Sequence, residues 1–171
     1  IVVVIHCVLN QNVRDVGAAT FPGYAKRVLP VLLEHDVGIF QLPCPEMLCL
    51  GLLRSRSKGD RIRDALDTPC GRRCCRALGR AAADQLQEHT EHNHRILGIV
   101  GGDKESPGCA VHLSEPKQEG DNRYRLENTA GVFMKALESE LLARGLVVPF
   151  LGMRESNRKD YEEDILKLSQ H

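Results

Sequence analysis

Three cysteines each stand just after a short apolar segment, and the three segments lie far apart in the chain. The segments are rich in β-branched residues, and the cysteines that follow them are Cys7, Cys44 and Cys109. In an open parallel sheet, ligands bind in the crevice beyond the carboxyl ends of the strands. Three thiols delivered there can meet at one point and bind a soft metal or an iron–sulfur cluster. The alternative is that they are small core residues, because a cysteine outside a disulfide is often buried.

The order of apolar segments and helical periodicity predicts the fold class. We expect strands over residues 1–7, 37–42, 96–100 and 146–151, and helices over residues 22–34, 66–90, 129–144 and 157–168. Strands that alternate with helices form a parallel sheet covered by helices on both faces. We therefore predict a single α/β domain over residues 1–171, built as a three-layer α/β/α sandwich with a mainly parallel, Rossmann/flavodoxin-like sheet.

Composition narrows the classes of partner and compartment. Lys plus Arg and Asp plus Glu both number 23 among 171 residues, which argues against a protein dominated by nucleic-acid binding. The sequence contains no apolar run of roughly 18 residues, so we expect no membrane-spanning helix. Seven cysteines without signs of secretion indicate metal binding or catalysis more than a disulfide framework, and favour a cytoplasmic protein.

Prolines flank two of the three cysteines. The sequences are Pro43-Cys44-Pro45-Glu46 and Ser106-Pro107-Gly108-Cys109. Proline fixes the backbone and removes an N–H donor, so both sequences are typical of rigid turns around a thiol.

These motifs carry a resemblance to a known family. His6-Cys7-Val8-Leu9-Asn10, the Leu42–Glu46 motif with Gly51-Leu52 and Arg54 after it, and Ser106-Pro107-Gly108-Cys109 resemble the 2-thiouracil desulfurase (TudS-like) family. The similarity is greatest to its uncharacterised, desulfidase-like branch, and extends to Phe150-Leu151-Gly152. It implies a [4Fe-4S] cluster held by three cysteines, with one iron left open. That iron would take the sulfur of a small thiocarbonyl compound, such as a thiouracil-like base or nucleotide, with release of sulfide.

The resemblance also assigns roles to residues. Cys7, Cys44 and Cys109 would be the cluster ligands. Beside these ligands, Glu46 and Ser106 are the nearest candidates for proton transfer and substrate positioning, because a carboxylate can activate water as a general base and a hydroxyl can orient water or substrate. A structural interpretation stays open for each residue. Glu46 can be a carboxylate at a helix N-terminus, and Ser106 can be a hydroxyl in a turn.

Three further residues are candidates for contact with substrate or proton transfer. Arg54 belongs to the second motif and Arg14 follows the first, so both are candidate substrate-binding residues. Glu105 is an alternative acid.

The sequence departs from the family pattern near all three ligands. The family's first motif often continues into an Arg-Tyr-Asp-Gly-like run, where this chain has Asn12-Val13-Arg14-Asp15. Gly108 and Ala110 replace a serine and a glycine of the third motif, and Cys49 stands in a stretch that is often glycine-rich. The three ligands remain, but these changes lie where a substrate would bind.

Other thiols and imidazoles form weaker patterns. Cys70, Cys74 and Cys75 could bind a metal, although Cys75 falls on an apolar helical stripe that favours core packing. We expect Cys49 to be a spare thiol near the Cys44 pocket. The run of His89, His92 and His94 is interpreted as a solvated helix end.

The leading hypothesis is thus an iron–sulfur-dependent desulfidase whose partner is a small thiolated substrate. Neither a membrane nor a nucleic acid is expected as a partner, whereas a thiolated nucleotide remains open; the sequence indicates no oligomeric state. The same three cysteines also suit a non-catalytic metal- or sulfide-binding protein. A cysteine phosphatase would need Cys-x5-Arg, but the residue at that spacing from Cys7 is Val13. A flavin binder would need a phosphate-binding loop after Cys7, which the sequence lacks.

Overall fold

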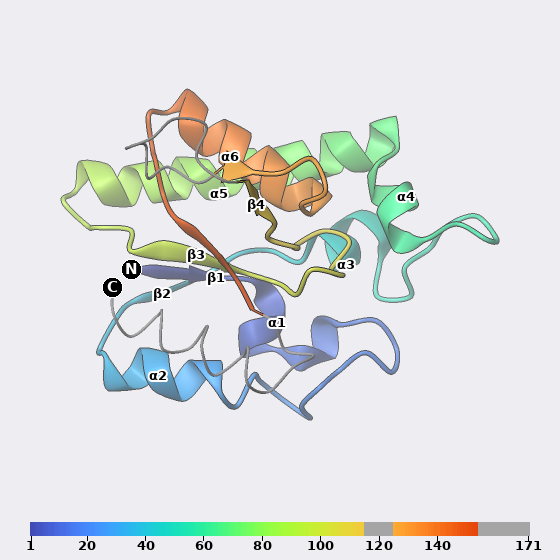
Figure 1. Ribbon diagram of the computed structural model, residues 1–171, viewed down its shortest axis with the longest axis horizontal. Coiled ribbons are helices and arrows are strands. Elements are labelled where there is room, and N and C mark those ends of the chain that lie inside the picture. Colours follow the sequence, from blue (N-terminus) through green and yellow to red (C-terminus); the bar gives the residue numbers. More distant parts are fainter. Residues whose placement is uncertain (115–124, 154–171) are drawn as a thin grey trace.

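The central layer of the protein is a four-stranded parallel sheet (Figure 1). The structure is a computed structural model that describes residues 1–114 and 125–153. The strands lie in the order β2-β1-β3-β6, and their bounds are Ile39–Gln41, Val2–Val4, Gly98–Gly101 and Phe150–Gly152. Val3, in the central pair, lies beside Phe40 on one side and Ile99 on the other. The predicted parallel α/β architecture is confirmed.

Helices cover both faces of this sheet. Figure 1 shows α1 (His6–Leu9) and α2 (Val28–Glu34) on one face, and α5 (Pro69–Glu91) and α6 (Val132–Ala143) on the other. From β1 the chain continues to β2 on one side. It then crosses to β3 on the other side of β1 and continues outward to β6. The switch point of this flavodoxin-like order therefore lies between β1 and β3, where open sheets bind ligands. None of the described helices is long and apolar enough to cross a membrane.

The longest helix, α5, is fixed at its start and along its length. The Thr68 hydroxyl accepts a hydrogen bond from the Gly71 amide, and Pro69 occupies the first turn, where it costs no hydrogen bond. At Gly79 the helix approaches α6 so closely that a Cβ atom would lie 3.1 Å from the Leu137 nitrogen. The two helices form a packed layer that covers the sheet.

Short elements at the carboxyl ends of the strands complete the fold. These are a 3-10 turn η1 (Gln11–Val13), α3 (Pro45–Leu50) and α4 (Ile62–Leu66). Figure 1 shows α3 beyond the end of the sheet. A two-stranded antiparallel ribbon, β4 (Leu113–Ser114) with β5 (Arg125–Leu126), lies between the strand predicted over 96–100 and the helix predicted over 129–144.

Several predicted bounds differ from those in the structure. The first strand ends at Val4, and Cys7 lies in the helix that follows. The helix expected from residue 22 begins at Val28, which places Pro30 in its first turn, where proline is tolerated. The helix predicted over 66–90 is present as α5, which begins three residues later, and α4 precedes it. The helix predicted over 157–168 lies outside the described residues.

Candidate functional site

The three predicted cysteine ligands follow three neighbouring strands. Cys7 lies in α1 directly after β1, and Cys44 is the residue that precedes the first turn of α3 after β2. Cys109 ends the loop that follows β3, where the Cys109 carbonyl accepts a hydrogen bond from the Gly102 amide at 2.7 Å. Because β2, β1 and β3 are adjacent and parallel, all three thiols are delivered to the same end of the sheet.

Cys109 lies at the buried centre of this group, with only 7% of its surface exposed. Burial raises the pKa of the Cys109 thiol well above its ordinary value, and the nearby Cys7, Cys44 and Glu46 raise it further. An ionised neighbour shifts a pKa in this way only at short range. Four of the predicted site residues therefore lie together.

Opposing effects act on the pKa of the Cys44 thiol. Its partial burial is the main factor that raises the pKa of its thiol, and the Glu46 charge adds to this. The backbone amides of Met47 and Glu46 at the start of α3, together with the Arg54 charge, act in the opposite direction. The amide groups of α3 thus favour a thiolate at Cys44, as expected of a helix start.

The loop that carries Cys109 is held by hydrogen bonds on both sides. The Cys109 amide donates to the Ser106 hydroxyl oxygen at 3.1 Å. The first amides of α6 donate to the carbonyls of Pro107 and Gly108. The turn role foreseen for Ser106 is therefore present, and its hydroxyl hydrogen remains able to donate. Glu105, the alternative acid, is exposed on this loop.

Gly108 lies where the loop that carries Cys109 meets the start of α3. A Cβ atom at this position would lie 2.6 Å from Cγ of Pro45, the residue that follows Cys44. No side chain fits there unless the loop moves. The absence of a side chain lets the second and third cysteine motifs pack directly against each other.

Glu46 is held in place by a buried arginine. The Arg54 guanidinium, only 1% exposed, donates to Glu46 Oε2 at 3.2 Å. Its other nitrogens donate to the carbonyls of Gly51, Leu52 and Val13. Arg54, which the sequence nominated as a substrate-binding residue, is thus turned toward protein acceptors and positions the Glu46 carboxylate.

A second buried polar residue, Gln11, supports the first cysteine and was not singled out from the sequence. Its Nε2 donates to the Cys7 carbonyl at 2.6 Å, and its Oε1 accepts from the Thr20 amide at 3.1 Å. Arg14, the other nominated substrate-binding residue, donates to the Thr20 hydroxyl at 3.3 Å and is partly buried. The position of Gln11, next to the first motif, was its only signal in the sequence.

The remaining cysteines are arranged differently from the metal pattern considered for them. Cys49 and Cys74 form a disulfide between α3 and α5, so Cys49 is not the spare thiol that the sequence led us to expect. Cys70 is exposed, and Cys75 is buried in the core. Burial, with a smaller effect of Asp67, raises the pKa of Cys75 to about 11. Cys75 also lies close enough to Cys109 to raise the pKa of the Cys109 thiol, so a fourth thiol lies near the site.

No single-ion metal site is formed by these groups. Across residues 1–114 and 125–153, no three His, Cys, Asp or Glu side chains are arranged to hold one metal ion. His89 instead packs edge-on against Phe40 and His94. This arrangement agrees with the structural interpretation of the histidine run.

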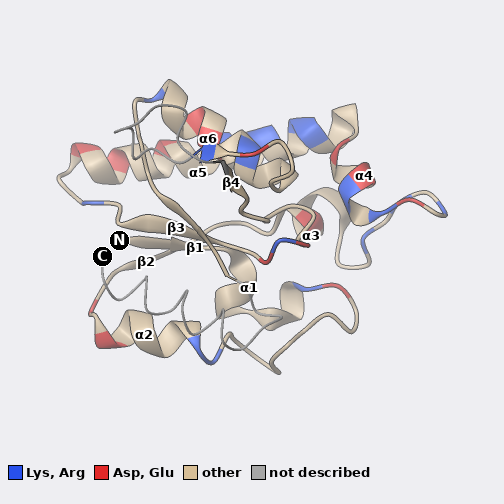
Figure 2. Ribbon diagram, viewed as in Figure 1, with Lys and Arg blue, Asp and Glu red and all other residues tan. Residues whose placement is uncertain are grey.

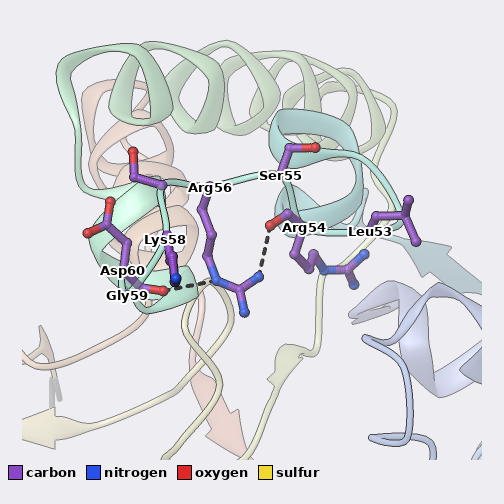
Figure 3. A pocket seen from close by; sticks show the side chains of 8 residues that line it. Leu53, Arg54, Ser55, Arg56, Lys58, Gly59 and Asp60 are labelled. Atoms are coloured by element: carbon purple, nitrogen blue, oxygen red, sulfur yellow. Dashed lines mark hydrogen bonds between the residues drawn. The ribbon is translucent and has the colours of Figure 1, made fainter.

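Charge is unevenly distributed around the site. Figure 2 shows Lys and Arg on the first half of α5 and on the loop before α4, whereas Asp and Glu lie on the second half of α5. Residues 53–60 of this loop surround an open hollow of about 520 Å³. Arg56 spans it by donating to the carbonyls of Arg54 and Asp60 (Figure 3). No cysteine lines the hollow, although Arg54, the partner of Glu46, is one of its lining residues.

Comparison with known proteins gives one informative similarity. The chain is 27% identical to the uncharacterized protein MJ0003 of Methanocaldococcus jannaschii over 168 residues, which cover 98% of this chain and 94% of that protein. No family model and no solved structure matches the chain. A counterpart of nearly the same extent therefore occurs in an archaeon.

Proposed function

We propose that the protein is an iron–sulfur-dependent desulfidase that removes sulfur from a small thiocarbonyl compound. The net reaction converts a thiocarbonyl group and water into a carbonyl group and hydrogen sulfide, so no external oxidant or reductant is needed. One observation carries the proposal: three thiols from neighbouring strand ends gather around buried Cys109, with the Glu46 carboxylate among them.

The donor set fits a [4Fe-4S] cluster. Three soft thiolates are the ligands that such a cluster requires when one iron remains open. In a single-zinc site, Zn–S bonds of about 2.3 Å place the thiolates roughly 3.8 Å apart, whereas each thiolate of a cluster binds a different iron. Cys7 and Cys44 lie near Cys109, and the described part of the chain forms no single-ion site.

The residues divide the work between holding the cofactor and moving protons. Cys7, Cys44 and Cys109 would hold the cluster, which when bound supplies an open iron as a Lewis acid for the soft sulfur of the substrate. Loading requires loss of the thiol protons, so the raised pKa of Cys109 makes it favourable at higher pH.

Glu46 is the general base in this proposal. Its carboxylate lies beside the thiol group and is fixed by Arg54, so it can accept a proton from the attacking water. The Ser106 hydroxyl, which already accepts from Cys109, can donate its hydrogen to water or to the substrate.

The test begins with anaerobic reconstitution of the full chain. We expect about four iron and about four acid-labile sulfide ions per chain, and release of sulfide from 2-thiouracil or a thiolated nucleotide. Cys7→Ser, Cys44→Ser and Cys109→Ser should each lose the cluster, whereas Cys70→Ser, at an exposed thiol, should retain it. Glu46→Gln should keep its iron and lose turnover.

The alternative functions give different results. Absence of a cluster, or zinc in its place, would rule out the desulfidase. A complete cluster without turnover on any thiolated base or nucleotide would favour a non-catalytic metal- or sulfide-binding protein.

A further inference from the structure

The Cys49–Cys74 disulfide is a covalent link between the site and the helical layer above the sheet. It joins the last turn of α3 to α5 across 25 residues of sequence, with the two Cα atoms 5.9 Å apart. Helix α3 has six residues, begins directly after Cys44 and carries Glu46 in its first turn. The disulfide therefore fixes the far end of the helix whose near end belongs to the candidate site.

The disulfide coexists with five cysteines that are not in disulfides. These are Cys7, Cys44, Cys70, Cys75 and Cys109. Cys70 is exposed and lies one helical turn before Cys74, so a general oxidation of accessible thiols would also oxidise Cys70. Under conditions in which such thiols persist, a disulfide is usually transient or redox-sensing. Both Cys49 and Cys74 are partly exposed and can be reached by an external thiol.

The other contacts of α3 show what opening the disulfide would release. Its start is held by Pro45, which packs against Gly108, and by the Arg54–Glu46 ion pair. Around its end, Leu48 and Leu52 are 52% and 54% exposed, whereas Leu50 packs against the core. The buried Arg54 also donates to the carbonyls of Gly51 and Leu52 in the turn that follows. Opening the disulfide removes the covalent link between the last turn of α3 and α5, and leaves Leu50 and the Arg54 hydrogen bonds to hold that end.

We propose that the Cys49–Cys74 pair is a redox-responsive site that sets how firmly α3 is held. A dithiol opens it in two exchange steps. One thiolate attacks a disulfide sulfur and forms a mixed disulfide, and the second thiol of the dithiol then displaces the other protein sulfur. The protein gains two thiols, and the dithiol loses two protons and two electrons to become a disulfide. The claim that the disulfide regulates the positions of Cys44 and Glu46 rests on the proposed function. The claim that its redox state sets how firmly α3 is held does not.

The experiment measures the disulfide and the helix together in the full chain. The protein is equilibrated in mixtures of reduced and oxidised dithiothreitol, its thiols are trapped by alkylation and located by mass spectrometry, and amide hydrogen exchange is followed. We expect Cys49 and Cys74 to become alkylated together while the chain stays folded. Amides at the end of α3 should then exchange roughly tenfold faster, with those of α6 unchanged.

Matched variants separate this effect from other thiols. Cys49→Ser and Cys74→Ser should show the faster α3 exchange without dithiothreitol, and Cys70→Ser, on the same helix, should show the slow exchange of the oxidised parent. The proposal fails if the disulfide opens only when α6 also loses protection, or if α3 exchange is the same in both states. Neither readout uses iron or turnover, so this proposal and the desulfidase can fail separately.

Discussion

Arg54 is a buried charged side chain that connects three segments of the site. It bonds to Glu46 in α3, to carbonyls of the following turn and to the Val13 carbonyl after the first cysteine motif. Its own backbone has a φ of 51°, a left-handed conformation that is uncommon for residues other than glycine. The motif identified Arg54 as part of the site, but spacing alone could not tell whether its guanidinium faces the substrate or the protein.

Replacing Arg54 should therefore destabilise the fold as well as displace Glu46. We expect Arg54→Met to lower the free energy of unfolding by roughly 3 kcal/mol, because one partner of a buried ion pair is lost and three carbonyls lose their donor. Urea unfolding of the metal-free protein measures this. In the control Arg72→Met, the ion pair with Asp67 is 59% and 47% exposed, and the expected change is below about 1 kcal/mol. Equal changes in the two variants would contradict the structural role of Arg54.

At the scale of elements, the site is assembled by packing one turn against two helices. The loop from Ser106 to Cys109 contacts Pro45 of α3 through Gly108, and its carbonyls accept from the first amides of α6. The sequence indicated a rigid turn around Cys109 because prolines and glycines mark such turns. It could not show what the turn packs against, since that contact joins residues more than sixty positions apart.

Gly108→Ala tests this packing directly. The added methyl group would overlap Pro45, and we expect a loss of roughly 2 kcal/mol of stability, the usual cost of overpacking. Cluster content after reconstitution should fall with it, because the overlap separates Cys109 from Cys44. Gly23→Ala is the matched control, since a Cβ atom at Gly23 meets nothing within 4 Å. A Gly108→Ala protein with unchanged stability and unchanged iron would show that the loop tolerates displacement.

At the scale of the whole molecule, the architecture was more predictable than the bounds of its elements. Four apolar segments separated by helical periodicity were enough to predict a parallel sheet, because few other topologies bury such strands. The apolar run 1–7 gave no sign that the strand stops at Val4, since periodicity cannot separate a short buried strand from the start of a helix. The Cys49–Cys74 contact was equally hidden, because it depends on how α3 packs against α5.

Because of the buried thiols, the free energy of unfolding of the metal-free protein falls at alkaline pH. Burial raises the pKa of Cys44, of Cys75 to about 11 and of Cys109, so the metal-free folded state holds these protons more tightly than the unfolded chain. These protonated thiols stabilise the fold fully below pH 9.0, the pKa of an unfolded thiol. This stabilisation is lost as pH rises toward the pKa values of the folded state.

We expect the urea midpoint of the metal-free protein, measured without oxygen, to fall from about pH 9 to about pH 11. Cys75→Ala should show a shallower fall, because the Cys75 proton no longer contributes. A midpoint that stays constant over this interval, or rises, would contradict the burial of these thiols.

The strand order also determines when the site can form during synthesis. β1 lies between β2 and β3, so the central strand of the sheet is translated before both of its neighbours. Cys7 and Cys44 leave the ribosome while the β3 side of β1 is still unpaired, and Cys109 follows only after the 23 residues of α5 and the whole of β3. A chain interrupted before residue 109 would hold two of the three thiols on an incomplete sheet. Insertion of the cluster proposed above would therefore wait until β3 has paired with β1 and the loop that carries Cys109 has formed.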